Sequence, residues 1–170
     1  MSLRFEPLTK AHDRKTFSSG SEILDRWFHT QAGQEERRSV TRVFVAVDEA
    51  GLVGFYTLSM YSIASGALPT AIAGALPRYP DVPAALIGRL ARAERVRGQG
   101  VGELLVVDGL RRILATSRDV PAFAIVVDAK DAHAQSFYAR LGFSPFPSRP
   151  SRMFMPLATA AGVLHGGAKK

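Results

Sequence analysis

Three glycines within five residues, Gly98, Gly100 and Gly102, separate two apolar runs in the stretch RVRGQGVG of this 170-residue chain. Glycine loses more backbone entropy on ordering than any other residue, so such a cluster indicates that the chain needs bare backbone here. The preceding residues 84–96 (AALIGRLARAERV) predict a strand. The following residues predict a mostly buried helix, because apolar side chains recur there at helical spacing: Val101, Leu104, Val107, Leu110 and Leu114.

A strand, a glycine cluster and a helix in this order predict a binding site for an anion. The first backbone N–H groups of the helix and its positive end meet at one point, which suits a phosphate group. A Walker loop would need Lys-Ser or Lys-Thr after Gly102, and a dinucleotide fingerprint would need glycine at position 103. The chain carries Glu103 there, which argues against both.

The remaining elements are expected in the order β, α, β, β, β, α, β, α, β, β. Ser21 is the expected N-cap of the first helix, in which Leu24, Trp27 and Phe28 share one apolar face. Residues 42–60 contain two β-branched and aromatic runs joined by Asp-Glu-Ala-Gly, which predicts a hairpin.

The second half of the chain continues this alternation. Residues 66–83 contain four prolines and predict a long loop with a short helix around Ile72. Residues 122–129 (AFAIVVDA) and 153–157 (MFMPL) predict strands. Residues 134–142 predict a helix that their last residue, a glycine, ends.

Composition limits the possible chemistry. The chain contains no cysteine, which excludes disulfides, cysteine zinc sites and a thiol nucleophile. Its formal net charge is +7, and no acidic residue follows Asp131. A polyanionic partner such as nucleic acid would explain this excess, and so would a surface that is basic only for solubility. A charged N-terminus and the lack of a run of about 18 apolar residues predict a cytoplasmic protein without a membrane segment.

Two stretches carry a family resemblance. Arg95, Gly98 and Gly100 fit the pattern Arg/Gln-x-x-Gly-x-Gly/Ala and resemble the acyl-CoA cradle of the GNAT family of N-acetyltransferases. DAKDAHAQSFYARLGF (residues 128–143) resembles the second signature of that family. The resemblance implies one α/β domain over residues 1–157, with a mostly antiparallel mixed sheet of about six to seven strands flanked by helices. Residues 158–170 are expected to form a flexible tail.

The resemblance also implies acetyl-CoA as the cofactor. In the GNAT family the middle strand offers backbone groups to the pantetheine arm, and the loop amides hold the pyrophosphate. The implied cofactor-binding residues lie on these two segments and on the second signature: Leu90, Ala91, Arg92, Arg95, Val96, Arg97, Gly98, Gly100, Val101, Gly102, Asp131 and Phe137. The family usually has asparagine at the position of Asp131, where an aspartate still caps the helix. No metal is expected.

Tyr138 is the candidate catalytic residue. The resemblance places its hydroxyl next to the thioester sulfur, where it can act as a general acid toward the departing thiolate. Because the chain has no cysteine, direct attack of the acceptor amine on acetyl-CoA is the economical route. No general base is evident, because the histidines are scattered along the chain: His12, His29, His133 and His165. An amine of low pKa, such as the amino group of an aminoacyl ester, needs no protein base.

A second resemblance concerns the acceptor. FSSGSEILDRWFHTQA (residues 17–32), the 42–60 hairpin and ALIGRLARAERVRGQGVG (residues 85–102) are similar to GNAT-type toxins, which acetylate aminoacyl-tRNA and are neutralised by a ribbon-helix-helix antitoxin. The similarity covers most of residues 15–156 and implies aminoacyl-tRNA as the acceptor, such an antitoxin as a partner, and a homodimer. Phosphate contacts are then expected from a set of arginines: Arg37, Arg38, Arg78, Arg89, Arg92, Arg140, Arg149 and Arg152.

Two other functions stay open from the sequence. An acetyltransferase for a small amine, an antibiotic or a protein amino group would share the cradle and Tyr138 but would not need the basic surface. A catalytically inactive acyl-CoA-binding module could keep the glycines as well. Measurable acetyl transfer would dismiss the inactive module.

Overall fold

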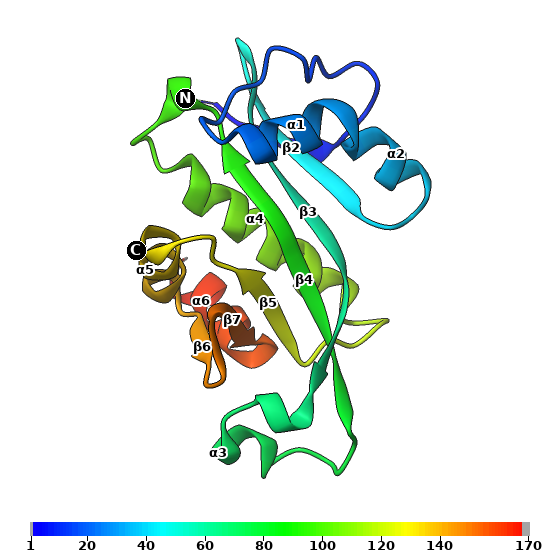
Figure 1. Cartoon of the computed structure of the whole chain (residues 1–170), viewed down its shortest axis with the longest axis vertical. Helices are drawn as coiled ribbons and strands as arrows, with labels where there is room; N and C mark the ends of the chain where they lie inside the picture. Colours follow the sequence, from blue (N-terminus) through cyan, green and yellow to red (C-terminus); the bar gives the residue numbers. More distant parts are fainter. Residues whose placement is uncertain (1, 168–170) are drawn as a thin grey trace. The chain divides into compact units, whose positions relative to one another are not determined.

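The structure is a computed structural model that describes residues 2–167 (Figure 1). Seven strands form one sheet in the order β1-β2-β3-β4-β5-β7-β6. The strands are β1 (Arg4–Pro7), β2 (Arg42–Asp48), β3 (Gly51–Ala64), β4 (Asp81–Arg92), β5 (Ala124–Asp128), β6 (Ser144–Phe146) and β7 (Arg149–Pro156). The pairs β1–β2, β2–β3, β5–β7 and β6–β7 are antiparallel and the pair β4–β5 is parallel, which confirms the predicted mixed α/β fold.

The helices follow the predicted order, with additions. They are α1 (Glu22–Thr30), α2 (Ala32–Arg37), α3 (Thr70–Ala73), α4 (Val101–Thr116), α5 (Ala132–Leu141) and α6 (Leu157–Gly167), with 3₁₀ turns at Ser65–Ala67 and Glu94–Val96. Among the described helices, none combines the length and the apolar character needed to cross a membrane. Neither α2 nor α6 was predicted from the sequence.

The chain divides into two compact units. The first contains the residues up to Ser59 together with Gly88–Gly109, and the second contains Met60–Ile87 together with the residues from Leu110 onward. The first unit therefore holds α1, α2 and the glycine-rich loop, and the second holds α3, α5 and α6.

The first unit has an aromatic core built on the predicted face of α1. Ser21 caps the helix as predicted, because its hydroxyl accepts a hydrogen bond from the Leu24 N–H at 3.4 Å. Trp27 and Phe28 are buried, and the Phe28 ring stacks on Phe55 of β3 with 4.1 Å between the ring centroids. Fully burying a Phe side chain stabilises a fold by about 1.5–3 kcal/mol, so this pair anchors α1 on the sheet.

Gly54 marks a close approach inside the first unit. A Cβ atom at this position would lie 2.8 Å from a methyl group of Leu105 in α4 and 2.9 Å from the backbone oxygen of Ala91 in β4. A glycine in a strand interior is typical of such a place, where another backbone comes near. The absence of a side chain at Gly54 therefore allows β3, β4 and α4 to pack at this distance.

The second unit is built around β5. Residues 124–127 are fully buried, as expected for an apolar strand that is covered on both faces. The next helix, α5, has the predicted residues at both of its ends. Asp131 caps α5 by accepting the Ala134 N–H at 2.8 Å, and Gly142 ends the helix with a left-handed φ of 109°.

The proline-rich segment differs from the predicted long loop at its end. The short helix α3 forms around Ile72 as predicted, but β4 begins early enough to include Pro83. The pairing of β4 with β5 starts only at Ala84, opposite Ala124, so the missing N–H of Pro83 interrupts no bond of that ladder. The Pro83 carbonyl instead accepts the Phe123 N–H at 2.8 Å.

The predicted flexible tail is a helix over most of its described length. Residues 157–167 form α6, because Ala160 is fully buried and the Leu157 N–H donates to the Phe123 carbonyl at 2.9 Å. Alanine has the highest intrinsic helix propensity, so the small side chains that suggested fraying also permit a helix. The last predicted tail residues, 168–170, lie outside the described residues.

Candidate active site

Two glycines of the glycine-rich loop in the first unit adopt a backbone conformation that favours glycine. Gly98 has a φ of 80° and Gly100 has a φ of 76°, both in the left-handed region that other residues avoid. No other group lies within 4 Å of a Cβ built on either glycine, so the requirement is conformational and not one of space. This geometry turns the chain from the end of β4 into the first turn of α4.

The loop presents a row of unused hydrogen-bond donors. Three of its amides have carbonyl acceptors, since the Val96, Arg97 and Gln99 N–H groups donate to Ala93, Glu94 and Val96 at 3.2, 3.0 and 3.2 Å. Between Gly98 and Glu103, five backbone N–H groups have no acceptor within residues 2–167, namely those of Gly98, Gly100, Val101, Gly102 and Glu103. Unpaired amides at the positive end of a helix bind phosphate groups. The loop therefore suits a phosphate group, and its contact with the pyrophosphate of acetyl-CoA stays a prediction.

Arg95 fastens this loop to the β2–β3 turn. Its guanidinium donates to both carboxylate oxygens of Asp48, at 2.9 and 2.8 Å, and to the carbonyls of Gly51 and Leu52 at 3.3 Å. The hydrogen bonds from Arg95 lower the pKa of Asp48 from its ordinary value of 3.8 to about 2, although burial opposes them. The Arg95 side chain is thus occupied inside the protein, and a direct contact with the cofactor stays a prediction.

The other implied cofactor residues of the first unit differ in what they can offer. Ala91 and Val96 are buried, so they can contribute backbone groups but hardly a side chain. Leu90 and Arg92 are partly exposed, and Arg97 is exposed. Arg97 therefore has the freest cation next to the unpaired amides.

Tyr138 lies on α5 in the second unit and is only 7% exposed. Its ring packs edge-on against Phe137 and Phe143, with centroid distances of 5.1 and 5.5 Å. Its hydroxyl makes no hydrogen bond within residues 2–167, yet no fully buried side-chain polar atom there lacks a partner. The hydroxyl oxygen therefore reaches the surface from an otherwise buried ring, and it can donate a proton to a bound molecule.

Burial raises the pKa of Tyr138 to about 12, and the negative charge of Asp128 adds to this effect. Desolvation disfavours the charged phenolate, so the hydroxyl keeps its proton across the physiological pH range. Tyr138 is thus present as an acid and not as a base.

Asp128 belongs to a second polar network in the same unit. Arg152 on β7 donates to its carboxylate from Nε at 2.8 Å and from Nη2 at 3.1 Å, and the two residues are direct partners across β5 and β7. The Arg152 guanidinium also lies over the Tyr61 ring, 5.0 Å from its centroid, and is hydrogen-bonded to the Tyr61 hydroxyl. Arg152 is therefore engaged internally, unlike the free phosphate-binding arginine that the sequence suggested. Asp128 was not among the site residues predicted from the sequence, because only the strand register reveals its partner.

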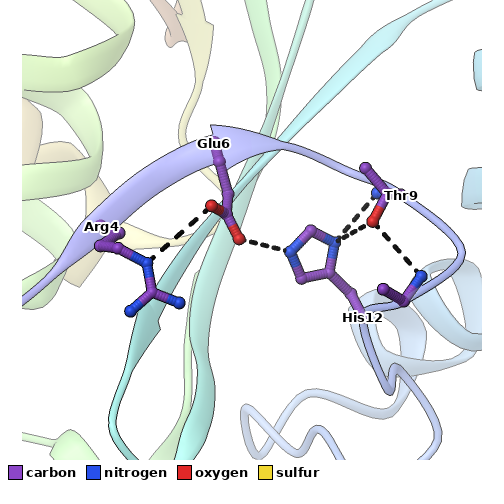
Figure 2. A network of polar contacts seen from close by, with 5 residues as sticks. Arg4, Glu6, Thr9 and His12 are labelled. Carbon is purple, nitrogen blue, oxygen red and sulfur yellow. Dashed lines mark hydrogen bonds and ion pairs between the residues drawn. The ribbon is translucent and has the colours of Figure 1, made fainter.

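Two of the histidines have structural partners in the first unit. Figure 2 shows His12 between Thr9 and Glu6: the Thr9 N–H donates to Nδ1 at 2.9 Å, so Nε2 carries the proton that is shared with Glu6 at 2.7 Å. This hydrogen bond lowers the pKa of Glu6. The His29 ring bonds the Phe17 carbonyl at 2.8 Å. Neither ring is free to act as a general base.

A cavity of about 720 Å³ lies next to this network in the first unit, and sequence reasoning did not find it. Its charged lining includes Arg4, Glu6 and Arg95, which are ion-paired within the protein, and the acids Asp13 and Glu94, for which no ion pair is found within residues 2–167. In the described part of the chain, no three His, Cys, Asp or Glu side chains gather as a metal ion would require.

The candidate residues thus fall into two groups. The structure brings the loop residues of the cofactor set together in the first unit, and it places Asp131, Phe137 and Tyr138 together on α5 in the second.

Comparisons with known proteins agree on one family. The acetyltransferase (GNAT) domain matches residues 39–145. A probable toxin TacT of Sinorhizobium fredii (strain NBRC 101917 / NGR234) is 31% identical over 169 residues, which cover 94% of this chain and 93% of that protein. A tRNA-acetylating toxin of Mycobacterium tuberculosis (strain ATCC 25618 / H37Rv) is 28% identical over 157 residues, which cover 92% of this chain and 93% of that protein.

Solved structures of the same kind share the fold over nearly the whole chain. AtaT complexed with acetyl-methionyl-tRNAfMet aligns with a TM-score of 0.88 and 26% identity, covering 96% of this chain and 99% of that chain. A tyrosine-to-phenylalanine mutant of KacT aligns with a TM-score of 0.89 and 28% identity, covering 96% of this chain and 99% of that chain. AtaTR bound with acetyl-CoA aligns with a TM-score of 0.83 and 27% identity, covering 95% of this chain and 98% of that chain.

Proposed function

Since the chain belongs to the GNAT family of N-acetyltransferases, which use acetyl-CoA, we propose that it acetylates the amino group of aminoacyl-tRNA and acts as the toxin of a toxin–antitoxin pair. The observation that carries this proposal is its similarity, over 96% of its length, to AtaT, whose complex contains acetyl-methionyl-tRNAfMet. The relative named as a tRNA-acetylating toxin and the net charge of +7 support the same acceptor.

The glycine-rich loop supplies the donor side of the reaction. The unpaired amides from Gly98 to Glu103 bind the pyrophosphate, and the positive end of α4 adds a favourable field. Arg95 holds the loop in this conformation through Asp48. Acetyl-CoA, when bound, supplies a thioester whose carbonyl carbon the acceptor amine attacks.

Tyr138 supplies the proton for the leaving sulfur. A thiol has an ordinary pKa of about 8.5, well below the value of about 12 to which burial raises the pKa of Tyr138. Burial near this ring raises the pKa of the leaving thiol in the same way. The difference between the pKa of the thiol and that of Tyr138 therefore becomes smaller. The hydroxyl can then pass its proton to the thiolate, and the resulting phenolate regains a proton from the acylated nitrogen through solvent, so that an amide and a thiol are the products.

The acceptor amine attacks directly and without a protein base. With no cysteine in the chain, a cysteinyl intermediate is excluded. His12 and His29 are hydrogen-bonded within the fold, whereas the side chains of His133 and His165 make no hydrogen bond within residues 2–167, and His133 is an exposed residue of α5, the helix that carries Tyr138. The ester of an aminoacyl-tRNA lowers the pKa of its amino group, so a neutral fraction is available near neutral pH.

Labelled acetyl transfer tests this proposal. Purified protein receives labelled acetyl-CoA together with charged tRNA, uncharged tRNA or a protein extract. The proposal expects label on charged tRNA alone and its loss in Tyr138→Phe. Label on polypeptides or small amines would replace the tRNA acceptor, and no label on any acceptor would favour a module that only binds acyl-CoA.

The partners are part of the same proposal. AtaTR, a neighbour of 27% identity, and the toxin names of the relatives support an antitoxin for this chain. We expect it to contain a ribbon-helix-helix domain, and we expect the toxin to be a cytoplasmic homodimer. Co-expression with a candidate ribbon-helix-helix protein, followed by sedimentation of the complex and of the free toxin, would measure both.

A further inference from the structure

Arg89 occupies an unusual place in the first unit. It lies on β4 and is partly buried, and its backbone N–H donates to the Thr57 hydroxyl at 2.9 Å. Its guanidinium carbon sits over the Trp27 ring, 4.2 Å from the ring centroid. A guanidinium on an aromatic face gains a cation–π interaction, and the contact covers one face of the cation while leaving its N–H edges open.

The charge of Arg89 is not compensated by the protein. Two other arginines of the same unit have carboxylate partners: Arg42 donates to Glu36 at 3.1 Å, and Arg95 donates to Asp48 at 2.8 Å. Within residues 2–167, the Arg89 side chain has neither a carboxylate partner nor a hydrogen bond. A partly buried cation with five unused donors favours the arrival of an anion.

The aromatic platform under Arg89 is fixed. The Trp27 indole N–H donates to the Glu35 carboxylate at 2.5 Å, so this acid is engaged by the indole. The Trp27 ring also stacks on Phe55, with 5.9 Å between the centroids. Arg89 is therefore held in one orientation before a ligand arrives, which lowers the entropic cost of binding.

We propose that Arg89 binds a phosphodiester group in the acceptor arm of the tRNA, with its two N–H edges donating to the phosphate oxygens. The inference rests on the proposed function for its ligand. Phosphate is the anion whose geometry matches a guanidinium fork. Acetyl-CoA carries phosphates too, but the unpaired amides of the glycine-rich loop already provide donors for its pyrophosphate.

The test uses the fluorescence of Trp27, which is the only tryptophan of the chain. The probe is a short RNA hairpin that ends in single-stranded CCA and carries no amino acid, so binding is measured without acetyl transfer. The RNA is titrated at several salt concentrations into the full-length protein, into Arg89→Met and into Arg89→Lys. Arg26→Ala is the matched control, because Arg26 precedes Trp27 on α1 but is exposed.

The proposal expects the RNA to change the fluorescence of the wild-type protein. Arg89→Met should weaken RNA binding about tenfold or more and should reduce the slope of log affinity against log salt by about one phosphate contact. Arg89→Lys should keep the slope and lose part of the affinity, because lysine retains the charge without the fork. Arg26→Ala should behave like the wild type. Unchanged CoA binding in all variants shows that the fold is intact.

Two results would overturn the inference. One is an Arg89→Met protein that binds the RNA with wild-type affinity and salt slope. The other is a variant that loses affinity for CoA and not for RNA, which would assign Arg89 to the donor. Failure of the proposed function looks different: the wild-type protein would bind the RNA through Arg89 and still leave charged tRNA without acetyl groups.

Discussion

Arg95 and Asp48, 47 positions apart in the chain, are joined by two hydrogen bonds of 2.8 and 2.9 Å that tie the glycine-rich loop to the β2–β3 turn. The Asp48 side chain is only 8% exposed, whereas that of Arg95 is 42% exposed. The pair therefore has a shielded acid and a partly solvated base. Its strength should depend on pH through the acid.

The first prediction concerns acid stability. Hydrogen bonds from Arg95 lower the pKa of Asp48 from 3.8 to about 2 in the folded chain, so the unfolded chain takes up this proton first as the pH falls. The stabilisation is complete above about pH 4 and is lost between about pH 4 and 2. Asp48→Asn should therefore unfold at lower urea concentration than wild type at pH 6, and the difference should vanish toward pH 2. Glu49→Gln, an exposed neighbour, is the control; a difference that persists at pH 2 would contradict the assignment.

The second prediction concerns the two left-handed glycines. Gly98→Ala and Gly100→Ala should each weaken CoA binding, because an alanine at a φ of 80° or 76° costs about 1–2 kcal/mol. This cost corresponds to about a five- to thirtyfold loss of affinity if the loop leaves its conformation. Calorimetric titration with CoA measures the loss. Gly66→Ala is the control, since no atom lies within 4 Å of its Cβ and its φ is not positive; equal affinities in all three variants would show that loop conformation does not matter.

The third prediction concerns Tyr138. Tyr138→Phe should lower kcat about 10²–10⁴-fold and leave the affinity for CoA unchanged, because the ring keeps its packing and only the proton donor is lost. Since burial raises the pKa of this phenol to about 12, ionisation of Tyr138 should not reduce kcat of the wild type below about pH 11. Steady-state rates from pH 6 to 10 test both points. A loss of activity with an apparent pKa near 10 would mean that the hydroxyl is more solvated than the structure indicates.

The fourth prediction concerns the close approach at Gly54. Gly54→Ala places a methyl group 2.8 Å from Leu105 and 2.9 Å from the Ala91 carbonyl oxygen, and the backbone oxygen cannot move aside as a side chain can. The substitution should destabilise the protein by about 1–3 kcal/mol, the usual cost of an overpacked core. Urea unfolding measures the change. The same substitution can be made in a Leu105→Ala protein. If the carbonyl contact dominates, Gly54→Ala should destabilise that protein almost as much as it destabilises the wild type, whereas no destabilisation there would place the strain on the leucine.

Local signals in the sequence predicted most of the fold. The Ser21 cap, the Asp131 cap and the Gly142 end depend on neighbouring residues only, and the structure has all three. The helix α2 was missed because its six residues, AGQEER, contain a single buried side chain, Ala32, and so lack an apolar period. The helix α6 was missed for a related reason: its small residues gain order through contacts with distant strands.

The parts of the site that depend on neighbouring residues could be predicted from the sequence. The parts that depend on how distant strands align could not. The position and conformation of the loop glycines follow from a strand, a turn and a helix in succession. The partners of Arg95 and Arg152 lie 47 and 24 residues away, on strands whose alignment no local pattern specifies. The stacking of Arg89 on Trp27 likewise joins β4 to α1 and becomes visible only in three dimensions.

The unpaired amides of the glycine-rich loop have a consequence for isotope labelling. A backbone N–H without an acceptor exchanges its hydrogen with solvent without any opening of the structure, whereas deeper in α4 exchange must wait for an opening event. In deuterated water, the amides of Gly98, Gly100, Gly102 and Glu103 should therefore lose their protons early in the free protein and late once phosphate oxygens cover them. Deuterium uptake over these few residues then counts the fraction of molecules that carry the acetyl donor, whether or not any acceptor is present.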